Sequence, residues 1–251
     1  MHMLVCFALK EEAAPFRKTA AGKAGISILL TGIGRKNAEK SVREFLAGGA
    51  SVPASRSEDD SPDQARLART LAPPDFVLTC GFAGGLNPDL ALGTVVFDLI
   101  DRRGEFHEPQ NENNIGDSQS SSLREKLVAA GAKPAKFFCA DRIATTVAEK
   151  KKLRAETGAE AVEMESRAIQ AICREHGIPC ATVRVISDTA HEDLPLDFNA
   201  LSKPDKNLDF GKLAWVIAKS PGKIGALLKL RKNTRFAAEQ LAEVLGKITF
   251  L

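Results

Sequence analysis

The stretch at residues 161–188, AVEMESRAIQAICREHGIPCATVRVISD, decides how the rest of the chain is interpreted. Its first half predicts an amphipathic helix that ends at Gly177 and Pro179. The apolar stripe of that helix consists of Val162, Ala168, Ile169, Ile172 and Cys173. Glu165 falls on this stripe, whereas Glu163 falls on the opposite, polar side. Because a carboxylate on the buried side of a helix is costly unless it is paired or reaches a pocket, Glu165 is the first candidate for a functional residue.

The second half of this stretch predicts a central strand of a parallel sheet. Residues 180–186 form an apolar run that only Arg184 interrupts. Ser187 and Asp188 follow at the carboxyl end of that strand, where open α/β sheets bind ligands. The whole unit would therefore direct Glu165, Arg184 and Asp188 towards one cleft.

The rest of the chain alternates between strand and helix patterns. We expect strands at residues 3–9, 25–31, 76–80, 93–100 and 135–139. We expect helices after Pro15, after residues 32–36, and at residues 65–71, 123–130, 149–156, 208–218 and 224–245, with 149–156 a charged surface helix. This order predicts a three-layer α/β/α sandwich with a central mixed β-sheet.

Two glycine-rich segments follow predicted strands. Gly32 and Gly34 would let the backbone approach a ligand at a helix N-terminus, although a plain tight turn explains them equally well. Asn37 stands where a dinucleotide-binding loop would have its third small residue. Residues 81–86, GFAGGL, predict a turn whose main chain lines a flat ligand, and a bulge or sharp bend has the same composition.

Length and composition describe one ordinary globular domain spanning residues 1–251. The chain is 44% hydrophobic and 27% charged, and its formal charge of +3 does not favour nucleic acid as a partner. No apolar run reaches the length of a membrane span, and the start MHMLVCFALKEE does not have the build of a secretory signal. The five cysteines read as buried thiols in a reducing compartment: Cys6, Cys80, Cys139, Cys173 and Cys180. We therefore expect a cytoplasmic protein.

Two segments look like additions to that domain. Residues 48–63 are rich in Ser, Asp, Pro and Gly, which predicts a surface insertion. Residues 208–251 form a basic helical C-terminal extension. Its cations suit either a solvated helix face or a membrane surface or other acidic partner, and they include Lys223, Lys229, Arg231, Lys232 and Arg235.

Several short motifs in a fixed order resemble the purine nucleoside phosphorylase and nucleosidase superfamily. They are ALKEE (8–12), TGIGRKNA (31–38), TCGFAGGL (79–86), GTVV (93–96), AVEMES (161–166) and VRVISD (183–188). The branch that they most resemble cleaves methylthioadenosine and S-adenosylhomocysteine. This resemblance implies a small-molecule purine nucleoside as substrate, a homodimer or larger homo-oligomer, and no metal or organic cofactor.

The resemblance also implies roles for individual residues. Glu12 would orient or activate the attacking water, and Asp188 would protonate the purine. The ribose would be bound within the VEMES motif, where Met164 and Glu165 match the family and Glu163 adjoins them, with Arg184 close by. The purine would contact Phe82, Ala83, Gly84, Ile143, Ala144, Ser187 and Phe198. Phe106 and His107 would close the pocket of a neighbouring subunit.

These roles agree with the chemistry of the reaction. Breaking a purine–ribose bond builds positive charge on the sugar and pushes electrons into the base, so it needs two separated carboxyl groups. The acid facing the base has to keep its proton near neutral pH, which a buried strand end favours. A structural alternative remains, in which Asp188 caps a turn and Arg184 neutralises Glu165.

The chain departs from the methylthioadenosine enzymes at two places. Phe82 replaces a small polar residue of the glycine segment, and Ile143 replaces the aromatic that stacks on the purine. The motifs DRIATT and TGAEAVEMES, with the basic tail, resemble nucleoside phosphorylases associated with hopanoid biosynthesis, which release adenine from a lipid-linked nucleoside. The resemblance therefore implies a 5′-modified adenosine and leaves the 5′ group open.

The nucleophile and the class of function have alternatives. A phosphorylase would hold phosphate at Gly32, Gly34 and Arg35, but Glu12 would repel phosphate, which favours hydrolysis. A non-catalytic nucleoside-binding protein on the same fold is a further alternative. Retention of Glu12, Glu165 and Asp188 together argues against it, because a binding protein needs no acid facing a base. A membrane-surface adaptor that uses the basic tail is a third.

Overall fold

The structure is a computed structural model, and it describes residues 2–48, 73–100, 118–201 and 221–249. The predicted insertion at 48–63, the predicted helices at 65–71 and 208–218, and Phe106 and His107 lie outside these residues, apart from Gly48. No helix in the described part of the chain is both long and apolar enough to cross a membrane.

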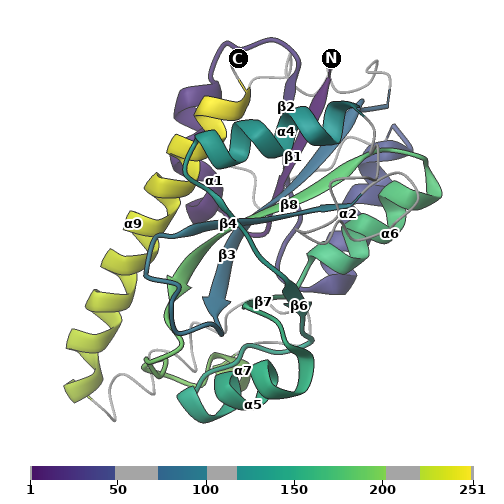
Figure 1. Cartoon of the computed structure of the whole chain (residues 1–251). Coiled ribbons are helices and arrows are strands. Elements are labelled where there is room, and N and C mark those ends of the chain that lie inside the picture. The colour runs from purple at the N-terminus through teal and green to yellow at the C-terminus, as the bar shows by residue number, and fades with distance from the viewer. Residues whose placement is uncertain (1, 49–72, 101–117, 202–220, 250–251) are drawn as a thin grey trace.

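A mixed sheet forms the centre of the molecule (Figure 1). Its strands are β1 (Met3–Phe7), β2 (Ile26–Leu30), β3 (Phe76–Gly85), β4 (Val95–Ile100), β5 (Lys133–Pro134), β6 (Phe137–Cys139), β7 (Ala161–Glu163) and β8 (Cys180–Asp188). The main path runs β2-β1-β3-β8-β4-β5. Strands β1, β2, β3 and β8 are mutually parallel, and β4 pairs antiparallel with β8. The carboxyl ends of β3 and β8 therefore meet at one edge.

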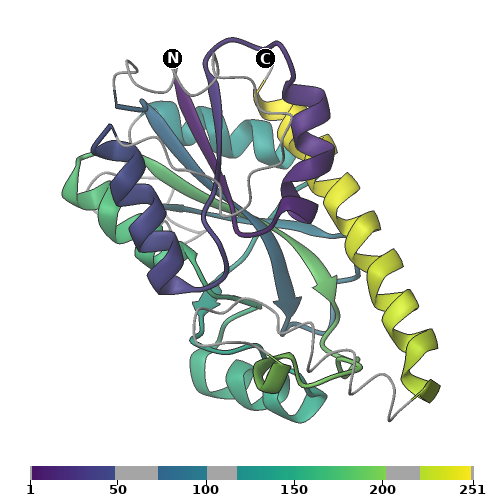
Figure 2. The same cartoon turned by 180° about the vertical axis from the view of Figure 1, so that it is seen from behind.

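Helices cover both faces of this sheet, as Figures 1 and 2 show from opposite sides. They are α1 (Lys10–Ala20), α2 (Arg35–Leu46), α4 (Ser118–Ala129), α5 (Val147–Thr157), α6 (Ser166–Glu175), α7 (Phe198–Leu201) and α9 (Ile224–Thr249), with the 3-10 turn η1 (Pro221–Lys223) before α9. On one face Phe16, Leu127 and Leu241 pack from α1, α4 and α9. On the other, Val42 and Ile169 pack from α2 and α6. The three-layer α/β/α prediction is confirmed.

The predicted helix at the start of the 161–188 stretch is wrong in its first turn. Residues Ala161–Glu163 form strand β7, which pairs antiparallel with the end of β3, and α6 begins only at Ser166. The last residues of β3 have backbone groups that can pair with another strand, and this pairing outweighs the helical spacing of Val162. As a result Glu163 is buried on a strand, not exposed on a helix, and Glu165 is the residue that precedes α6.

The predicted glycine turn at 81–86 is also wrong. Strand β3 continues through Gly85 and pairs with β8 as far as Asp188, with a shift of register between Ala83 and Gly84. This irregularity is the bulge that the composition had left open. The strand can extend because β8 and β7 both supply partners for its last residues.

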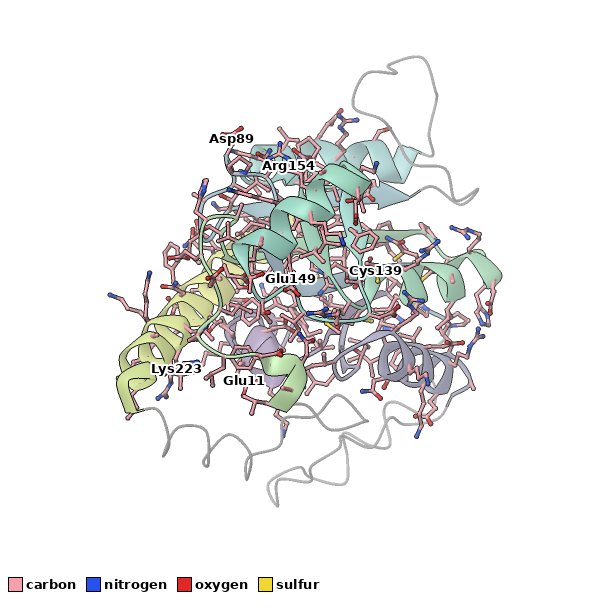
Figure 3. All side chains as sticks on the ribbon, turned by 90° about the horizontal axis from the view of Figure 1, so that it is seen from below. Glu11, Asp89, Cys139, Glu149, Arg154 and Lys223 are labelled. Carbon is pink, nitrogen blue, oxygen red and sulfur yellow. The ribbon has the colours of Figure 1, made fainter. Side chains whose placement is uncertain are left out.

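The helix predicted at 149–156 is longer than expected and is not simply a surface helix. It spans Val147–Thr157, capped by Thr146 and Glu149 at its start and by Gly158 in a left-handed conformation at its end. Lys150 on this helix is fully buried. Figure 3 faces the carboxyl ends of β3 and β8, with Glu149 and Arg154 of α5 towards the viewer.

Candidate active site

Arg184 of β8 is the centre of a buried cluster of charged side chains. Its guanidinium donates to Glu163 Oε2 at 2.7 Å and lies 3.4 Å from Glu165 Oε2. It also donates to the carbonyl of Cys80 and the hydroxyl of Thr79, both at 3.1 Å. Only 1% of Arg184 is exposed. A buried cation needs this density of partners, so Arg184 ties β8 to β3 and to the segment before α6.

Glu163 is bonded on every side by protein groups. Its Oε2 accepts from the backbone N–H of Glu165 at 3.0 Å and of Ser166 at 2.8 Å, and its Oε1 accepts from the Ser166 hydroxyl at 2.6 Å. With the Arg184 bond added, this carboxylate fixes the start of α6. The arrangement favours a supporting role for Glu163 over direct contact with a substrate.

Glu165 and the glycine segment before α2 meet next to this cluster. Glu165 Oε1 accepts from the backbone N–H of Gly34 at 2.8 Å. Burial raises the pKa of Glu165 to about 7, against the opposing effect of Arg184 and with the added repulsion of Glu163. The neighbouring Arg35 forms an ion pair with Asp141 at 3.1 Å, so it bridges α2 to the loop before α5.

Glu12 reaches the same cluster from the first turn of α1. Its two oxygens accept from the backbone N–H groups of Leu9 and Phe82, each at 2.8 Å. Burial raises the pKa of Glu12, although Arg184 and these backbone donors act against the rise. The close approach depends on Gly81, whose φ is +144°, because a Cβ there would lie 2.6 Å from Arg184 Nη1 and 2.7 Å from Glu12 Oε1.

Asp188 lies at the other end of the same strand edge. Its Oδ1 accepts from the Ser187 hydroxyl at 2.9 Å, and the Ser187 hydroxyl lies 3.4 Å from the carbonyl of Ala83. A Cβ on Gly84 would come within 3.2 Å of Asp188 Oδ2, so glycine leaves room for this carboxylate. The side chain of Asp188 keeps 13% of its surface exposed.

Strand β3 connects the two groups of carboxylates. Gly81 adjoins Glu12, and Gly84 adjoins Asp188. Three residues of extended strand span about 10 Å. Glu12 and Asp188 therefore lie against two points of the same strand that are about 10 Å apart along its backbone.

The remaining predicted contact residues lie on three segments. Met164 is buried between Glu163 and Glu165, and Ile143 and Ala144 lie in the loop between β6 and α5. Asn199 of α7 bonds both the N–H and the carbonyl of Ile143 at 2.9 Å, which holds the neighbouring Phe198 near this loop.

Lys150 is the residue of this site that the sequence analysis missed. It is fully buried, and its Nζ lies 2.6 Å from Asp188 Oδ2. A signal existed, since Val147, Lys150 and Leu153 recur every three residues and so place Lys150 on the inward stripe of α5. Its position within the run EKKKLR made it look like one more solvated cation.

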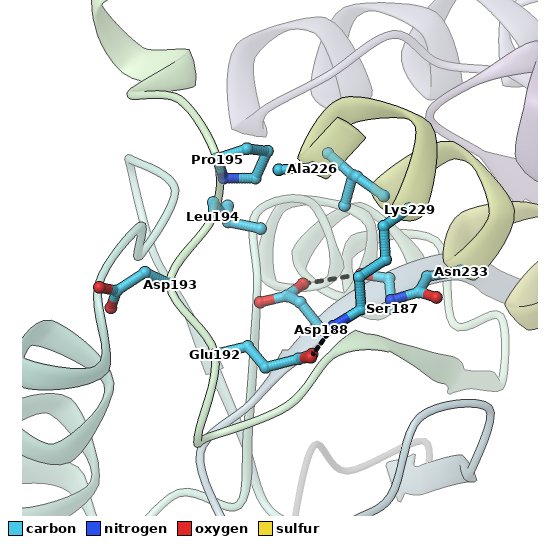
Figure 4. Close-up of a pocket in the computed structure, with 10 residues that line it drawn as sticks. Ser187, Asp188, Glu192, Asp193, Leu194, Pro195, Ala226, Lys229 and Asn233 are labelled. Atoms are coloured by element: carbon cyan, nitrogen blue, oxygen red, sulfur yellow. Dashed lines mark hydrogen bonds and ion pairs between the residues drawn. The ribbon is translucent and has the colours of Figure 1, made fainter. Parts of the chain in front are cut away.

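A cavity of about 250 Å³ opens beside Asp188 (Figure 4). Its lining comes from the end of β8, the loop after it and the first half of α9, and includes Ser187, Asp188, Leu194, Pro195, Ala226 and Leu230. Lys229 of α9 and Glu192 of the loop form an ion pair at 2.7 Å at its edge. Asp188 is thus accessible from the α9 side.

No group of three or more His, Cys, Asp or Glu side chains in the described ranges is arranged to hold a metal ion. Four of the five cysteines are buried and all five are free thiols. Burial raises the pKa of the Cys80 thiol beyond its usual range, so this thiol is not activated as a nucleophile. The ionisable groups described at the site are carboxyl groups together with Arg184 and Lys150, with Arg35 and Lys229 at its margins.

Comparisons with known proteins agree with this fold. A family model described as the phosphorylase superfamily matches residues 9–213. The chain belongs to the phosphorylase superfamily.

Its relatives point to particular members of that family. A 5′-methylthioadenosine/S-adenosylhomocysteine nucleosidase of Shewanella halifaxensis is 30% identical over 184 residues, which cover 62% of this chain and 77% of the relative. An aminodeoxyfutalosine nucleosidase of Helicobacter pylori is 31% identical over 86 residues, 34% of this chain and 33% of the relative.

Solved structures show the same fold. The futalosine hydrolase of Helicobacter pylori superposes with a TM-score of 0.60 at 17% identity, covering 99% of this chain and 97% of the other. The methylthioadenosine/S-adenosylhomocysteine nucleosidase of Colwellia psychrerythraea, solved in complex with adenine, gives a TM-score of 0.60 at 16% identity, covering 99% and 94%.

Proposed function

We propose that the chain hydrolyses the N-glycosidic bond of an adenine nucleoside that carries a modified 5′ position. The coarser statement, that it is an enzyme acting on N-glycosidic bonds, follows from its family and its nucleosidase relatives. The observation that carries the proposal is the placement of Glu12 beside Gly81 and of Asp188 beside Gly84, two points about 10 Å apart along strand β3.

The two carboxyl groups would take different roles. Glu12 is buried with a raised pKa, so its carboxylate is a stronger base than an exposed one and suits the activation of water. Asp188 faces the opposite end of the gap and would protonate the leaving base. Glu165 would accept hydrogen bonds from the ribose hydroxyls, which fixes the sugar between the two.

Two contacts support water over phosphate as the nucleophile. Glu165 occupies the N–H of Gly34, and Arg35 is paired with Asp141. A phosphate at this loop would need both donors and would face the carboxylates of Glu12 and Glu165. Repulsion between the negative phosphate and these two carboxylates disfavours phosphate binding.

The 5′ modification is inferred from the relatives' names, since methylthioadenosine and S-adenosylhomocysteine both carry one. Phe82 and Ile143 stand where the resemblance implies other residues, so this pocket has its own shape. An adenosine with a long alkyl chain at the 5′ position therefore belongs in the substrate panel, beside methylthioadenosine, S-adenosylhomocysteine, adenosine and inosine.

The test is base release from this panel, with and without phosphate, and identification of the sugar. We expect adenine and a free sugar in the absence of phosphate. The Asp188→Asn variant should lose about 10²–10⁴-fold in rate, and Asp89→Asn, at an exposed aspartate away from the site, should not. Strict phosphate dependence with a sugar 1-phosphate would establish a phosphorylase. Binding of adenine without any cleavage would establish a binding protein.

A further inference from the structure

The amino group of Lys150 has a complete set of acceptors inside the protein. Its Nζ lies 2.6 Å from Asp188 Oδ2, 2.7 Å from the carbonyl of Thr189 and 2.9 Å from the carbonyl of Glu192. An ammonium group has three hydrogens, so each has one partner. None of the Lys150 surface is exposed. A fully buried lysine is rare unless it has a specific task or partner.

This geometry conflicts with a simple acid role for Asp188. A neighbouring cation favours the ionised form of a carboxyl group, and an ionised carboxylate has no proton to give. Yet the departing base has to receive a proton as the bond to the sugar breaks. The proton available at this place is the third hydrogen of the Lys150 ammonium, which already points at Asp188.

We propose that Lys150 supplies the proton that Asp188 passes to the leaving base. The inference rests on the proposed function and deepens it. As the C1′–N9 bond breaks and its electron pair moves into the base, Nζ of Lys150 gives a proton to the carboxylate of Asp188, and Asp188 passes a proton on to the base and is left as the carboxylate. The neutral amine keeps two hydrogens, which stay on the carbonyls of Thr189 and Glu192. Lys150 does not touch the substrate, and it acts as a positioning residue through Asp188.

The surroundings fit a pair that shares a proton. From the loop after β8, Glu192 and Asp193 approach, and Glu192 is paired with Lys229 of α9. Asp193 accepts from the N–H of Val147 at 2.6 Å, and Glu149 of α5 is bonded to Thr145 and Arg142. These charges are therefore satisfied elsewhere. The cavity beside Asp188 offers water a path to return the proton after each turnover.

The test is the pH profile of Lys150→Met, measured as adenine release between pH 5 and pH 9. An isolated carboxylic acid in water loses its proton near pH 4, whereas an ammonium group keeps it to about pH 10. Above its pKa a carboxylic acid loses about tenfold of its protonated form per pH unit, so a variant without Lys150 would depend on protons from the solvent. We expect a loss of about 10²–10⁴-fold at pH 8 that shrinks steadily towards pH 5. Lys151→Met, at an exposed lysine of the same helix, should keep the wild-type profile.

A second variant keeps the inference testable if Lys150→Met does not fold. Lys150→Arg keeps the positive charge but holds its proton at every accessible pH, so it should remain inactive at pH 8. Recovery of activity in Lys150→Arg, or a loss in Lys150→Met by the same factor at every pH, would overturn the role. Failure of the wild-type chain to release any base would instead contradict the proposed function itself.

Discussion

A single arginine holds three carboxyl groups in the interior of this protein. Glu163 is neutralised by a 2.7 Å bond to Arg184, while Glu12 and Glu165 are held largely by backbone N–H groups. One positive charge cannot compensate three negative ones, so protonation becomes favourable at the less well paired sites. Burial is the main cause of the raised pKa values of Glu12 and Glu165, Arg184 only partly offsets it, and repulsion from the neighbouring carboxylates adds to the rise at Glu165.

This imbalance predicts a stability that falls with pH. The pKa of Glu165 is raised from 4.5 in the unfolded chain to about 7 in the folded protein, so the folded state binds the extra proton between these values. The free energy of unfolding should therefore fall as pH rises through that window, by roughly 1–3 kcal/mol. Urea unfolding at pH 5 and pH 8 measures it.

The matched variants for this prediction are Glu165→Gln and Glu163→Gln. The first removes the titrating group and should flatten the fall in stability. The second breaks the bond to Arg184 and should lower stability at both pH values. An unchanged slope in Glu165→Gln would mean that another group, such as Glu12, carries the pH dependence.

At the scale of elements, the far end of β3 decides the geometry of the site. Its residues pass between β7 and β8, and they approach Glu12 at Gly81 and Asp188 at Gly84. A side chain at either glycine would push a carboxylate out of place. The end of β3 therefore sets how far apart Glu12 and Asp188 lie.

Gly81→Ala should separate Glu12 from Arg184. The new Cβ would lie under 3 Å from both side chains, and alanine is strained at a φ of +144°. Gly131→Ala is the matched control, since its φ of +96° is also positive but nothing lies within 4 Å of its Cβ. We expect the control to lose about 1–3 kcal/mol of unfolding free energy by urea titration. Gly81→Ala should lose more unfolding free energy than the control, and it should also lose adenine release. Equal losses in the two variants would argue against the close contact of Gly81 with Glu12 and Arg184.

Helix α9 shows how far the C-terminal segment belongs to the body of the protein. Its basic side chains Lys229 and Arg235 face solvent, as one interpretation of the sequence expected. Its apolar side packs on α1 and on the sheet through buried residues such as Leu241 and Leu245. We therefore propose that α9 is part of the same single domain.

Two leucine substitutions in α9 test this. Leu241 is fully buried, and Leu241→Ala should lower the free energy of unfolding by about 2–5 kcal/mol. Leu228 is 60% exposed, and Leu228→Ala should change it by no more than about 0.5 kcal/mol. Small effects from both substitutions, measured by urea titration, would show that α9 adds little to the fold.

At the scale of the whole molecule, three layers bring together residues from distant parts of the chain. Glu12 comes from α1, Lys150 from α5, and Arg184 and Asp188 from β8. These elements converge because the carboxyl ends of the parallel strands β3 and β8 point towards α5 and α7 (Figure 1). Ligand binding should consequently stabilise the fold as one unit.

Adenine gives a direct measure of that coupling. At a concentration 100-fold above its Kd, a ligand that binds only the folded state adds about 2.7 kcal/mol. For a chain of this size that corresponds to a rise in Tm of roughly 5–10 °C. Thermal unfolding with adenine should show this rise, and phosphate alone should not. A rise with phosphate alone would favour phosphorolysis.

The sequence by itself determined the layers and most strands and helices, and it predicted four charged residues of the candidate site. Local patterns suffice for these features, because buried strands, the apolar stripes of helices and short motifs can each be recognised from residues close together in the sequence. Glu165, Arg184 and Asp188 were found in this way, whereas Glu12 was found only through the resemblance of the ALKEE motif, and the roles of all four stay predictions.

Only the tertiary structure decided the details that depend on pairing at a distance. Residues 161–163 became a strand because β3 had free ladder positions, and this turned Glu163 inward. Residues 81–85 stayed in β3 because β7 and β8 continue beside them. Lys150 was recognised only when Asp188, 38 positions further along the chain, was found 2.6 Å away. A charge on a helix is solvated by default, and only the fold determines which one is buried against a partner.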